Sequence, residues 1–379
     1  MTTVAGPASG HLPALDGLRA IAVLLVIAHN ADSFTATHGW NAIAVLPSRM
    51  GWIGVQLFFV LSGFLITRGL LERKGAADYY RLFFRRRALR IFPLYFLTLT
   101  FFLVILPRLV ALPEAVLATY RNQVPLWVFV NNWTDPLAGG VYWFSHCWSL
   151  AVEEQFYLVW PLVVATLAET RLLTACVVIA AGAVALRTLL FAVGLGPGVL
   201  YEWTVCRMDA LAVGAGIAVI VRSAPAVRVV KGREGCVLLA AIALILSTGL
   251  LTQWYSIGSL AMMTLGYTAL SFGFGGIVLV GIVGAPKGVV ATLNGALAGR
   301  ALQPVARYSY AMYLMHLPIT LALRPRLSSV LEPAGALAPV LYTAAVMILT
   351  FLAAALSFFF VEKRLRFYQN AGLRPVGTG

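Results

Sequence analysis

Apolar stretches of about 20 residues recur along this chain and restrict it to one class of fold. Of its 379 residues, 60% are hydrophobic and 11% are charged, whereas a soluble domain has about 25% charged residues. A helix that spans a membrane needs about 20 mostly apolar residues. The sequence therefore predicts an all-α, polytopic integral membrane protein with about ten transmembrane helices, near residues 14–32, 51–71, 92–112, 148–168, 171–193, 207–222, 234–252, 257–284, 304–323 and 336–360.

Basic residues concentrate in alternate loops. The loop between the second and third predicted spans is the richest, and others follow the sixth, eighth and last spans. Because loops rich in lysine and arginine stay in the cytoplasm, both termini are predicted to be cytoplasmic, with 361–379 as a tail. The largest loop on the outer side is then 113–147. The same rule explains the net charge of +14, so no nucleic-acid partner is predicted.

The chain is expected to form a single membrane domain over 1–379, with helices from about 14 to 360 and no appended soluble domain. No charged region precedes the first apolar segment, so a cleavable signal is not expected. The four cysteines form no CxxC pair, and no clustered Cys/His spacing indicates a metal site. A disulfide between Cys147 and Cys206 is left open.

Two ionisable residues interrupt the first apolar segment. Arg19 lies near its cytoplasmic end, and His29 follows about 15 Å further along a helix. An arginine at the inner mouth can bind an anionic group such as phosphate. A buried histidine can act as a general base because its pKa is near neutral. In the alternative interpretation Arg19 pairs with Asp16, and His29 caps a polar helix end.

A basic run precedes the third span. Arg87 and Arg90 are three residues apart and share one face of a helix. They could bind the phosphates of a cytoplasmic, nucleotide-like donor. They could equally anchor the helix to anionic lipids, which is the interpretation that this run favours when it is taken alone.

Two adjacent carboxylates, Glu153 and Glu154, lie just inside the fourth span. Neighbouring residues of a helix point about 100° apart, so one is expected to face the bundle interior and the other to support a neighbour. Either could orient an imidazole, pair with an arginine or serve as a base. A structural ion pair is the competing interpretation.

Other polar residues lie within or beside the apolar segments, where charges are costly and usually functional. Arg207 and Asp209 enter the sixth span together, as an internal ion pair or as the lining of a polar cavity. His316 follows Tyr313 by three residues, and a structural role is favoured for it. Four more positions are candidates for substrate binding or structure: Ser62, His146, Trp148 and Ser149.

Taken together, these motifs resemble acyltransferase family 3 of the membrane O-acyltransferases. The matching pieces run in the family's order over nearly the whole chain: 15–22 with His29, 54–67, 87–93, 146–161, 207–214 and 309–318. The resemblance implies a ten-helix domain that takes an acyl group, usually acetyl from cytoplasmic acetyl-CoA. It also implies delivery of this group to a hydroxyl at or beyond the outer face.

The resemblance also implies roles for residues. Arg19 and His29 match the family's essential pair, and the paired carboxylates match Glu153 and Glu154; these four are the expected catalytic residues. Arg87 and Arg90 match arginines associated with donor binding, to which Arg19 could contribute. Gln56 stands where many members have an aspartate, which removes one charge from the second span.

These inferences predict a membrane O-acyltransferase of a bacterial cytoplasmic (inner) membrane, surrounded by lipid and needing no metal. The expected donor is acetyl-CoA or another acyl-CoA, and the acceptor is a hydroxyl of a surface glycan, a lipid-linked sugar or a glycolipid. Acylation of a small secondary metabolite such as a macrolide is one alternative, and a separate partner protein that accepts the acyl group is another. The competing class is a transporter, although the inverted repeats typical of transporters are not evident.

Overall fold

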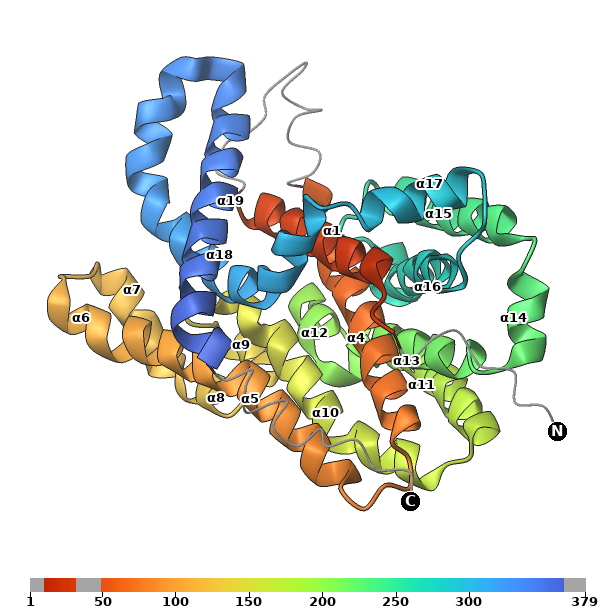
Figure 1. The fold of residues 1–379 in the computed structure, drawn as a ribbon. Helices are drawn as coiled ribbons and strands as arrows, with labels where there is room; N and C mark the ends of the chain where they lie inside the picture. Colours follow the sequence, from red (N-terminus) through yellow and green to blue (C-terminus); the bar gives the residue numbers. More distant parts are fainter. Residues whose placement is uncertain (1–9, 32–48, 365–379) are drawn as a thin grey trace.

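The computed structural model describes residues 10–31 and 49–364, which form a bundle of α-helices with no β-strand among them (Figure 1). The predicted all-α class is confirmed. Eight helices in this part of the chain are long and apolar enough to cross a membrane. The prediction of a polytopic membrane protein is therefore confirmed as well. Most of the predicted cytoplasmic tail, 365–379, lies outside the described residues.

Seven of these eight spans each consist of one α-helix, which in three of them is extended by an irregular helical turn. They comprise α1 (Pro13–Asn30), α4 (Ile53–Glu72), α5 (Tyr79–Thr100, continued through Leu109), α11 (Glu169–Ala192), α15 (Glu234–Leu251), α16 (Tyr267–Val283, preceded by a π-helical turn, Met262–Gly266) and α19 (Ala338–Ser357, continued through Glu362). The eighth joins α12 (Pro197–Glu202) and α13 (Thr204–Ile220), so the predicted span 207–222 is longer than expected.

Two predicted spans, 148–168 and 304–323, coincide with α10 (Trp148–Thr166) and α18 (Leu302–Leu331), which are not among these eight. Both helices carry polar residues, among them Glu153 and Glu154 in α10 and His316 in α18. In Figure 1, α18 and α19 lie side by side as an antiparallel pair. The total of ten spans, and the side on which the termini lie, remain predictions.

The shorter helices lie in the connections. On the predicted outer side, the long loop folds into α7 (Glu114–Thr119), α8 (Val124–Trp127), α9 (Asn131–Ala138) and a 3-10 turn, Ser145–Cys147. The others are α6 (Leu106–Leu109), α14 (Ala224–Val230) and α17 (Val289–Leu297). All four cysteines are free thiols, so Cys147 and Cys206 form no disulfide.

Glycines allow α4 and α13 to approach at backbone distance. A Cβ atom added to Gly63 would lie 2.0 Å from the carbonyl oxygen of Leu211, and one added to Gly214 would lie 2.0 Å from that of Val60. Small residues at helix contacts are a common feature of packing in membranes, where burial of apolar surface drives association less than close contact does. This pair of helices forms a rigid centre that fixes the side chains of α4 facing the site.

Candidate functional site

A cavity of about 110 Å³ lies between α1, α4, α5, α10 and α18. Its walls are partly apolar, formed by residues such as Val55, Phe58 and Leu65. It also brings together polar residues that are far apart in the sequence. The predicted site residues that line it are Arg19, Ser62, Arg87, Arg90, Ser149, Glu153, Glu154 and Tyr313. We call this space the inner cavity.

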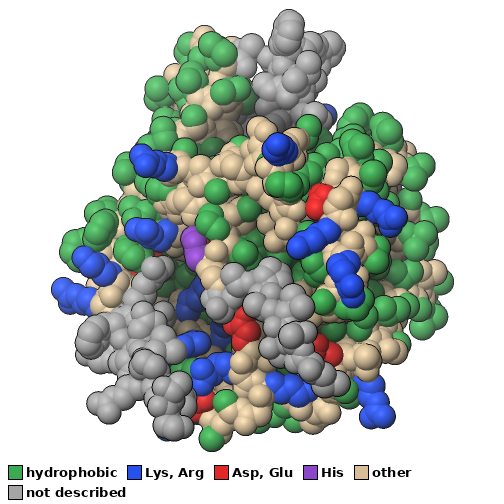
Figure 2. Space-filling view, turned by 45° about the vertical axis from the view of Figure 1, so that its right-hand side comes forward, with side chains coloured by type: hydrophobic (Ala, Val, Ile, Leu, Met, Phe, Trp, Pro, Cys, Tyr) green, Lys and Arg blue, Asp and Glu red, His purple; other side chains and the backbone are tan. Residues whose placement is uncertain are grey.

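A larger and more polar cavity of about 480 Å³ adjoins it. Arg19, Arg90 and Tyr310 border both spaces, so the two meet at these residues. We call the larger space the vestibule; its remaining lining residues are His11, Asp16, Leu89, Gln303, Ala306, Arg307 and Glu362. Figure 2 shows basic and acidic side chains interspersed on one face of the molecule, among apolar ones. The helix ends that border the vestibule are all ends that the sequence predicts to be cytoplasmic.

Glu153 is held in place at the wall of the inner cavity. Ser62 of α4 donates a hydrogen bond to its Oε1 at 2.8 Å, and Tyr157, one turn further along α10, donates to its Oε2 at 2.7 Å. Hydrogen bonds to an ionised carboxylate are stronger than those between neutral groups. Both oxygens are therefore fixed by groups from two helices, which gives this carboxylate a defined orientation.

Glu154 differs from its neighbour. Its Oε1 is buried and has no hydrogen-bond partner among the described residues. Both carboxylates line the inner cavity, whereas only one was expected to face the interior. The cavity extends around a wide sector of α10, so side chains about 100° apart both reach it. One carboxylate is anchored and the other remains available to a bound molecule.

Three arginines bring positive charge to this region. Arg87 places its guanidinium over the rings of Phe83 and Tyr157, at 5.8 and 5.6 Å from their centroids, contacts that attract a cation to an aromatic face. Arg90 is exposed where the two cavities meet. Arg19 lies 4.0 Å from Asp16, so the ion pair considered from the sequence is present. Arg19 also borders both the inner cavity and the vestibule.

A second polar group lies beyond the inner cavity and contains the predicted histidines. Tyr313 donates its hydroxyl proton to the carbonyl oxygen of His146 at 3.1 Å, and its oxygen also contacts the hydroxyl of Ser149. Because Tyr313 and Ser149 line the cavity as well, they join the two regions. His29 is half-buried near the end of α1 and does not line either cavity.

The histidine rings are close to one another. The rings of His146 and His316 are 4.6 Å apart, with an angle of 71° between their planes. His316 is fully buried, and its Nδ1 lies 2.5 Å from the carbonyl oxygen of Tyr313. Since a carbonyl can only accept, Nδ1 carries the proton and Nε2 carries the lone pair. The helix α1, which carries His29, packs against α18, which carries His316.

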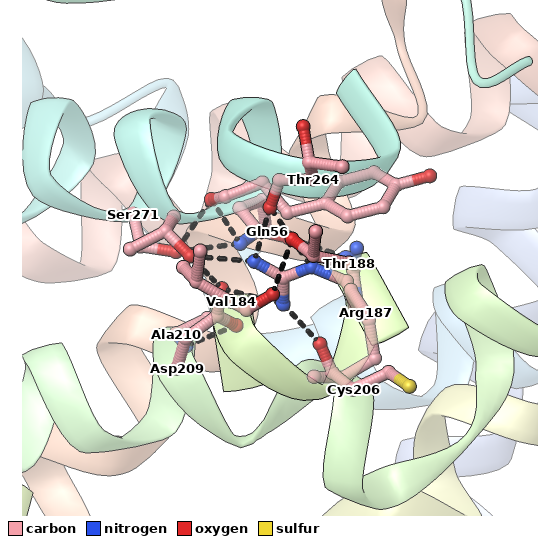
Figure 3. Close-up of polar contacts among 12 residues, drawn as sticks. Gln56, Val184, Arg187, Thr188, Cys206, Asp209, Ala210, Thr264 and Ser271 are labelled. Carbon is pink, nitrogen blue, oxygen red and sulfur yellow. Dashed lines mark hydrogen bonds and ion pairs between the residues drawn. The ribbon is translucent and has the colours of Figure 1, made fainter. Parts of the chain in front are cut away.

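Arg207 and Asp209 do not pair with each other, and neither lines the inner cavity or the vestibule. Asp209 pairs with Arg187 of α11 at 3.0 Å, and both side chains are fully buried (Figure 3). Residues two apart on a helix point about 200° apart, which directs Arg207 and Asp209 to different neighbours. Arg187 was not among the residues predicted from the sequence, although a lone arginine within an apolar segment is the kind of signal that marks such a site.

Arg207 lies instead among aromatic rings. Its guanidinium carbon is 4.3 Å from the ring centroid of Tyr267 and 5.0 Å from that of Tyr201, with the ring of Trp148 at 5.8 Å. It also donates a hydrogen bond to the side-chain oxygen of Gln56. Trp148 begins α10, so this contact fixes the start of the helix that carries the two carboxylates.

The side-chain amide of Gln56 forms hydrogen bonds through both its nitrogen and its oxygen. Its nitrogen donates to the carbonyl oxygen of Tyr267 at 2.8 Å and to the hydroxyl of Ser271 at 2.6 Å, while its oxygen accepts from Arg207. A carboxylate has no proton to donate to the Tyr267 carbonyl. In this chain the glutamine therefore links α4, α13 and α16, and the expected loss of charge is accompanied by a gain in hydrogen bonding.

Ionisable side chains around cavities inside a bundle of apolar helices define a membrane protein with a buried functional site. The model of a family described as the acyltransferase domain matches residues 12–359. The chain therefore belongs to this family of acyltransferases, and the resemblance inferred from the motifs is confirmed.

Three relatives carry names that describe O-acetylation. The chain is 28% identical to the peptidoglycan O-acetyltransferase OatA of Listeria monocytogenes, over 94% of this chain and 56% of the relative. It is 28% identical to the putative peptidoglycan O-acetyltransferase YrhL of Bacillus subtilis, over 94% of this chain and 55% of the relative. It is 34% identical to the O-acetyltransferase OatA of Staphylococcus aureus, over 41% of this chain and 25% of the relative.

The chain thus spans about half the length of the relatives that it matches over most of its own length. No solved structure matches the chain.

Proposed function

We propose that this protein moves an acetyl group from acetyl-CoA, on the cytoplasmic side of a bacterial cytoplasmic membrane, to a hydroxyl of a peptidoglycan-type glycan on the outer side. One observation carries the proposal: the vestibule and the inner cavity meet at Arg19 and Arg90. The two cavities form a route whose entrance, the vestibule, is basic and whose inner part is narrower and partly apolar. This matches a donor that has phosphates at one end and a thioester at the other.

The donor's phosphates would bind at the entrance of this route. Guanidinium groups bind phosphate through paired, charge-assisted hydrogen bonds, and Arg90 is exposed to a bound molecule in both spaces. The thin arm that carries the thioester would pass between apolar residues such as Val55 and Leu65. Arg87, turned inward over two aromatic rings, would contact the donor at the narrower end.

The transfer itself needs a base for the acceptor and a proton for the leaving group. The acceptor oxygen attacks the thioester carbonyl carbon, the carbon–sulfur bond breaks, and the hydroxyl proton passes to His29 acting as general base. The leaving thiolate takes up a proton to give free CoA. We assign Glu154, whose Oε1 has no partner among the described residues, as the acid that donates this proton. Glu153 is fixed by hydrogen bonds from Ser62 and Tyr157 and would provide a negative charge in a fixed position at the wall of the inner cavity.

The acceptor is inferred from the relatives. Two of those that match most of this chain are named for O-acetylation of peptidoglycan, and this supports a glycan more than a small metabolite. His29 lies at the end of α1 that the sequence predicts to be outside. An acceptor approaching from the outer face would reach it without crossing the vestibule.

The test is a transfer assay with purified protein in lipid nanodiscs. Acetyl-CoA labelled on the acetyl group and soluble peptidoglycan fragments are the substrates. We expect label on the glycan with the wild type and a loss of about 10²–10⁴-fold in rate for His29→Ala. Asn30→Ala is the matched control, since among the described residues Asn30 donates a hydrogen bond to the carbonyl oxygen of Val26 in its own helix, at 3.0 Å. No transfer by the wild type, or full activity of His29→Ala, would contradict the proposal.

A further inference from the structure

Aromatic and polar side chains gather where α9 meets α12, on the predicted outer side. The rings of Trp133 and Trp203 are 5.1 Å apart and tilted by 42°, and both side chains are partly exposed. Asn131 donates a hydrogen bond to Asp135 at 3.1 Å, and Asp135 interacts electrostatically with Glu202. We call these five residues the outer cluster.

The outer cluster contains several buried polar atoms without partners. Neither Oδ1 of Asn131, Oε2 of Glu202 nor Nε1 of Trp203 has a hydrogen-bond partner among the described residues. Asn131 is fully buried, and its amide is directed at the cluster by its bond to Asp135. Leaving a buried polar atom unpaired destabilises a fold, so three such atoms in neighbouring residues mark a place where a bound molecule would supply the missing hydrogen bonds.

The cluster is held rigidly against the helix of the two carboxylates. Gln155 of α10 accepts a hydrogen bond from the indole nitrogen of Trp133 at 3.0 Å, and its amide donates to Asn132 at 2.8 Å. Asn132 in turn donates to Thr204 at 2.9 Å. A site whose side chains are already ordered loses little conformational freedom when a ligand binds.

The cluster also lies near the histidines. The helix α9, which carries Asn131 and Asp135, contacts the turn Ser145–Cys147, which contains His146. The ring of His146 contacts that of His316, and α18, which carries His316, packs against α1, which carries His29. A molecule bound to the cluster would therefore lie near the turn that carries His146.

We propose that the outer cluster is a subsite for a sugar ring of the acceptor. The tryptophan rings offer apolar faces for the C–H groups of a pyranose, and an indole has a polar N–H at its edge. Glu202 and Trp203 are partly exposed, and a rotation of each side chain toward the bound sugar lets Oε2 of Glu202 accept from one hydroxyl and Nε1 of Trp203 donate to another. A hydroxyl both donates and accepts, so a polyol suits both groups. This inference rests on the proposed function and extends it from the reaction to the recognition of the acceptor.

The test measures binding and kinetics separately. Binding of chitotetraose, a tetramer of β-1,4-linked N-acetylglucosamine, to the protein in nanodiscs is followed by calorimetry without acyl-CoA. The KM values for acetyl-CoA and for the glycan are then measured in the transfer assay. We expect Trp203→Phe and Glu202→Gln each to weaken chitotetraose binding and to raise the glycan KM by about 3–10-fold, the value of one lost hydrogen bond, without changing the KM for acetyl-CoA.

The matched control is Trp254→Phe, which changes a second exposed tryptophan on the predicted outer side and is expected to leave both values unchanged. Conservative variants with wild-type melting temperatures exclude misfolding as the cause. If they bind chitotetraose and use the glycan as well as the wild type does, the subsite is refuted even if transfer itself occurs. If the wild type fails to transfer acetyl but binds chitotetraose in a manner that depends on Trp203, the proposed function fails and the subsite stands.

Discussion

The buried pair between Arg187 and Asp209 gives the sharpest test of the fold. Arg187 also donates to the hydroxyl of Thr268 at 2.6 Å and to the carbonyl oxygen of Thr264 at 3.0 Å, and both members of the pair are 0% exposed. Breaking a buried ion pair by removing one partner costs about 3–5 kcal/mol, because a charge is left uncompensated. Asp209→Asn leaves Arg187 and the nearby Arg207 without this carboxylate.

We therefore expect Asp209→Asn to destabilise the protein by about 3 kcal/mol or more. At about 2 °C per kcal/mol for a large chain, the melting temperature in detergent should fall by about 6 °C. Thr188→Ala is the matched control, because Thr188 follows Arg187 in the helix but is exposed. It should shift the melting temperature by less than about 1 °C, as surface substitutions change stability little.

The double variant Arg187→Met with Asp209→Leu tests the cause. It removes both charges together, and replacement of a whole buried pair by apolar residues is often close to neutral. It should therefore melt at a higher temperature than Asp209→Asn alone. A melting temperature for Asp209→Asn within about 1 °C of the wild type would refute the assigned partner and the energetic argument built on it.

Three further outcomes are expected. Arg90→Ala should raise the KM for acetyl-CoA by about tenfold or more, the value of a hydrogen bond to a charged group, while Arg81→Ala, outside both cavities, should not. Gly63→Ala should lower the melting temperature, because its Cβ would lie 2.0 Å from a backbone oxygen of α13, whereas Gly69→Ala meets nothing within 4 Å and should stabilise α4 by up to about 1 kcal/mol. Burial raises the pKa of Asp135 to about 6 from 3.8, so the folded protein holds this proton more tightly than the unfolded chain does. The resulting stabilisation is fully present below about pH 4 and is lost as the pH rises through about 6. Asp135→Asn should remove this pH dependence of the melting temperature between about pH 4 and 6.

Several residues that line the inner cavity could be predicted from the sequence, because a local property of the sequence marked each of them. Arg19, Glu153 and Glu154 are charges within apolar segments, where they are too costly to be accidental. Arg87 and Arg90 could be paired by their spacing on one helix face. The vestibule had no such signal for Arg307 and Gln303, because polar residues near the end of a span are ordinary.

The sequence by itself determined the class of the protein, since the length of its apolar segments and the scarcity of charge leave no other fold. Periodicity also showed which residues share a helix face. It could not show which helix lies opposite that face, because this depends on contacts between segments far apart in the chain. Only the tertiary structure paired Asp209 with Arg187 instead of Arg207, and only it packed α1, which carries His29, against α18, which carries His316.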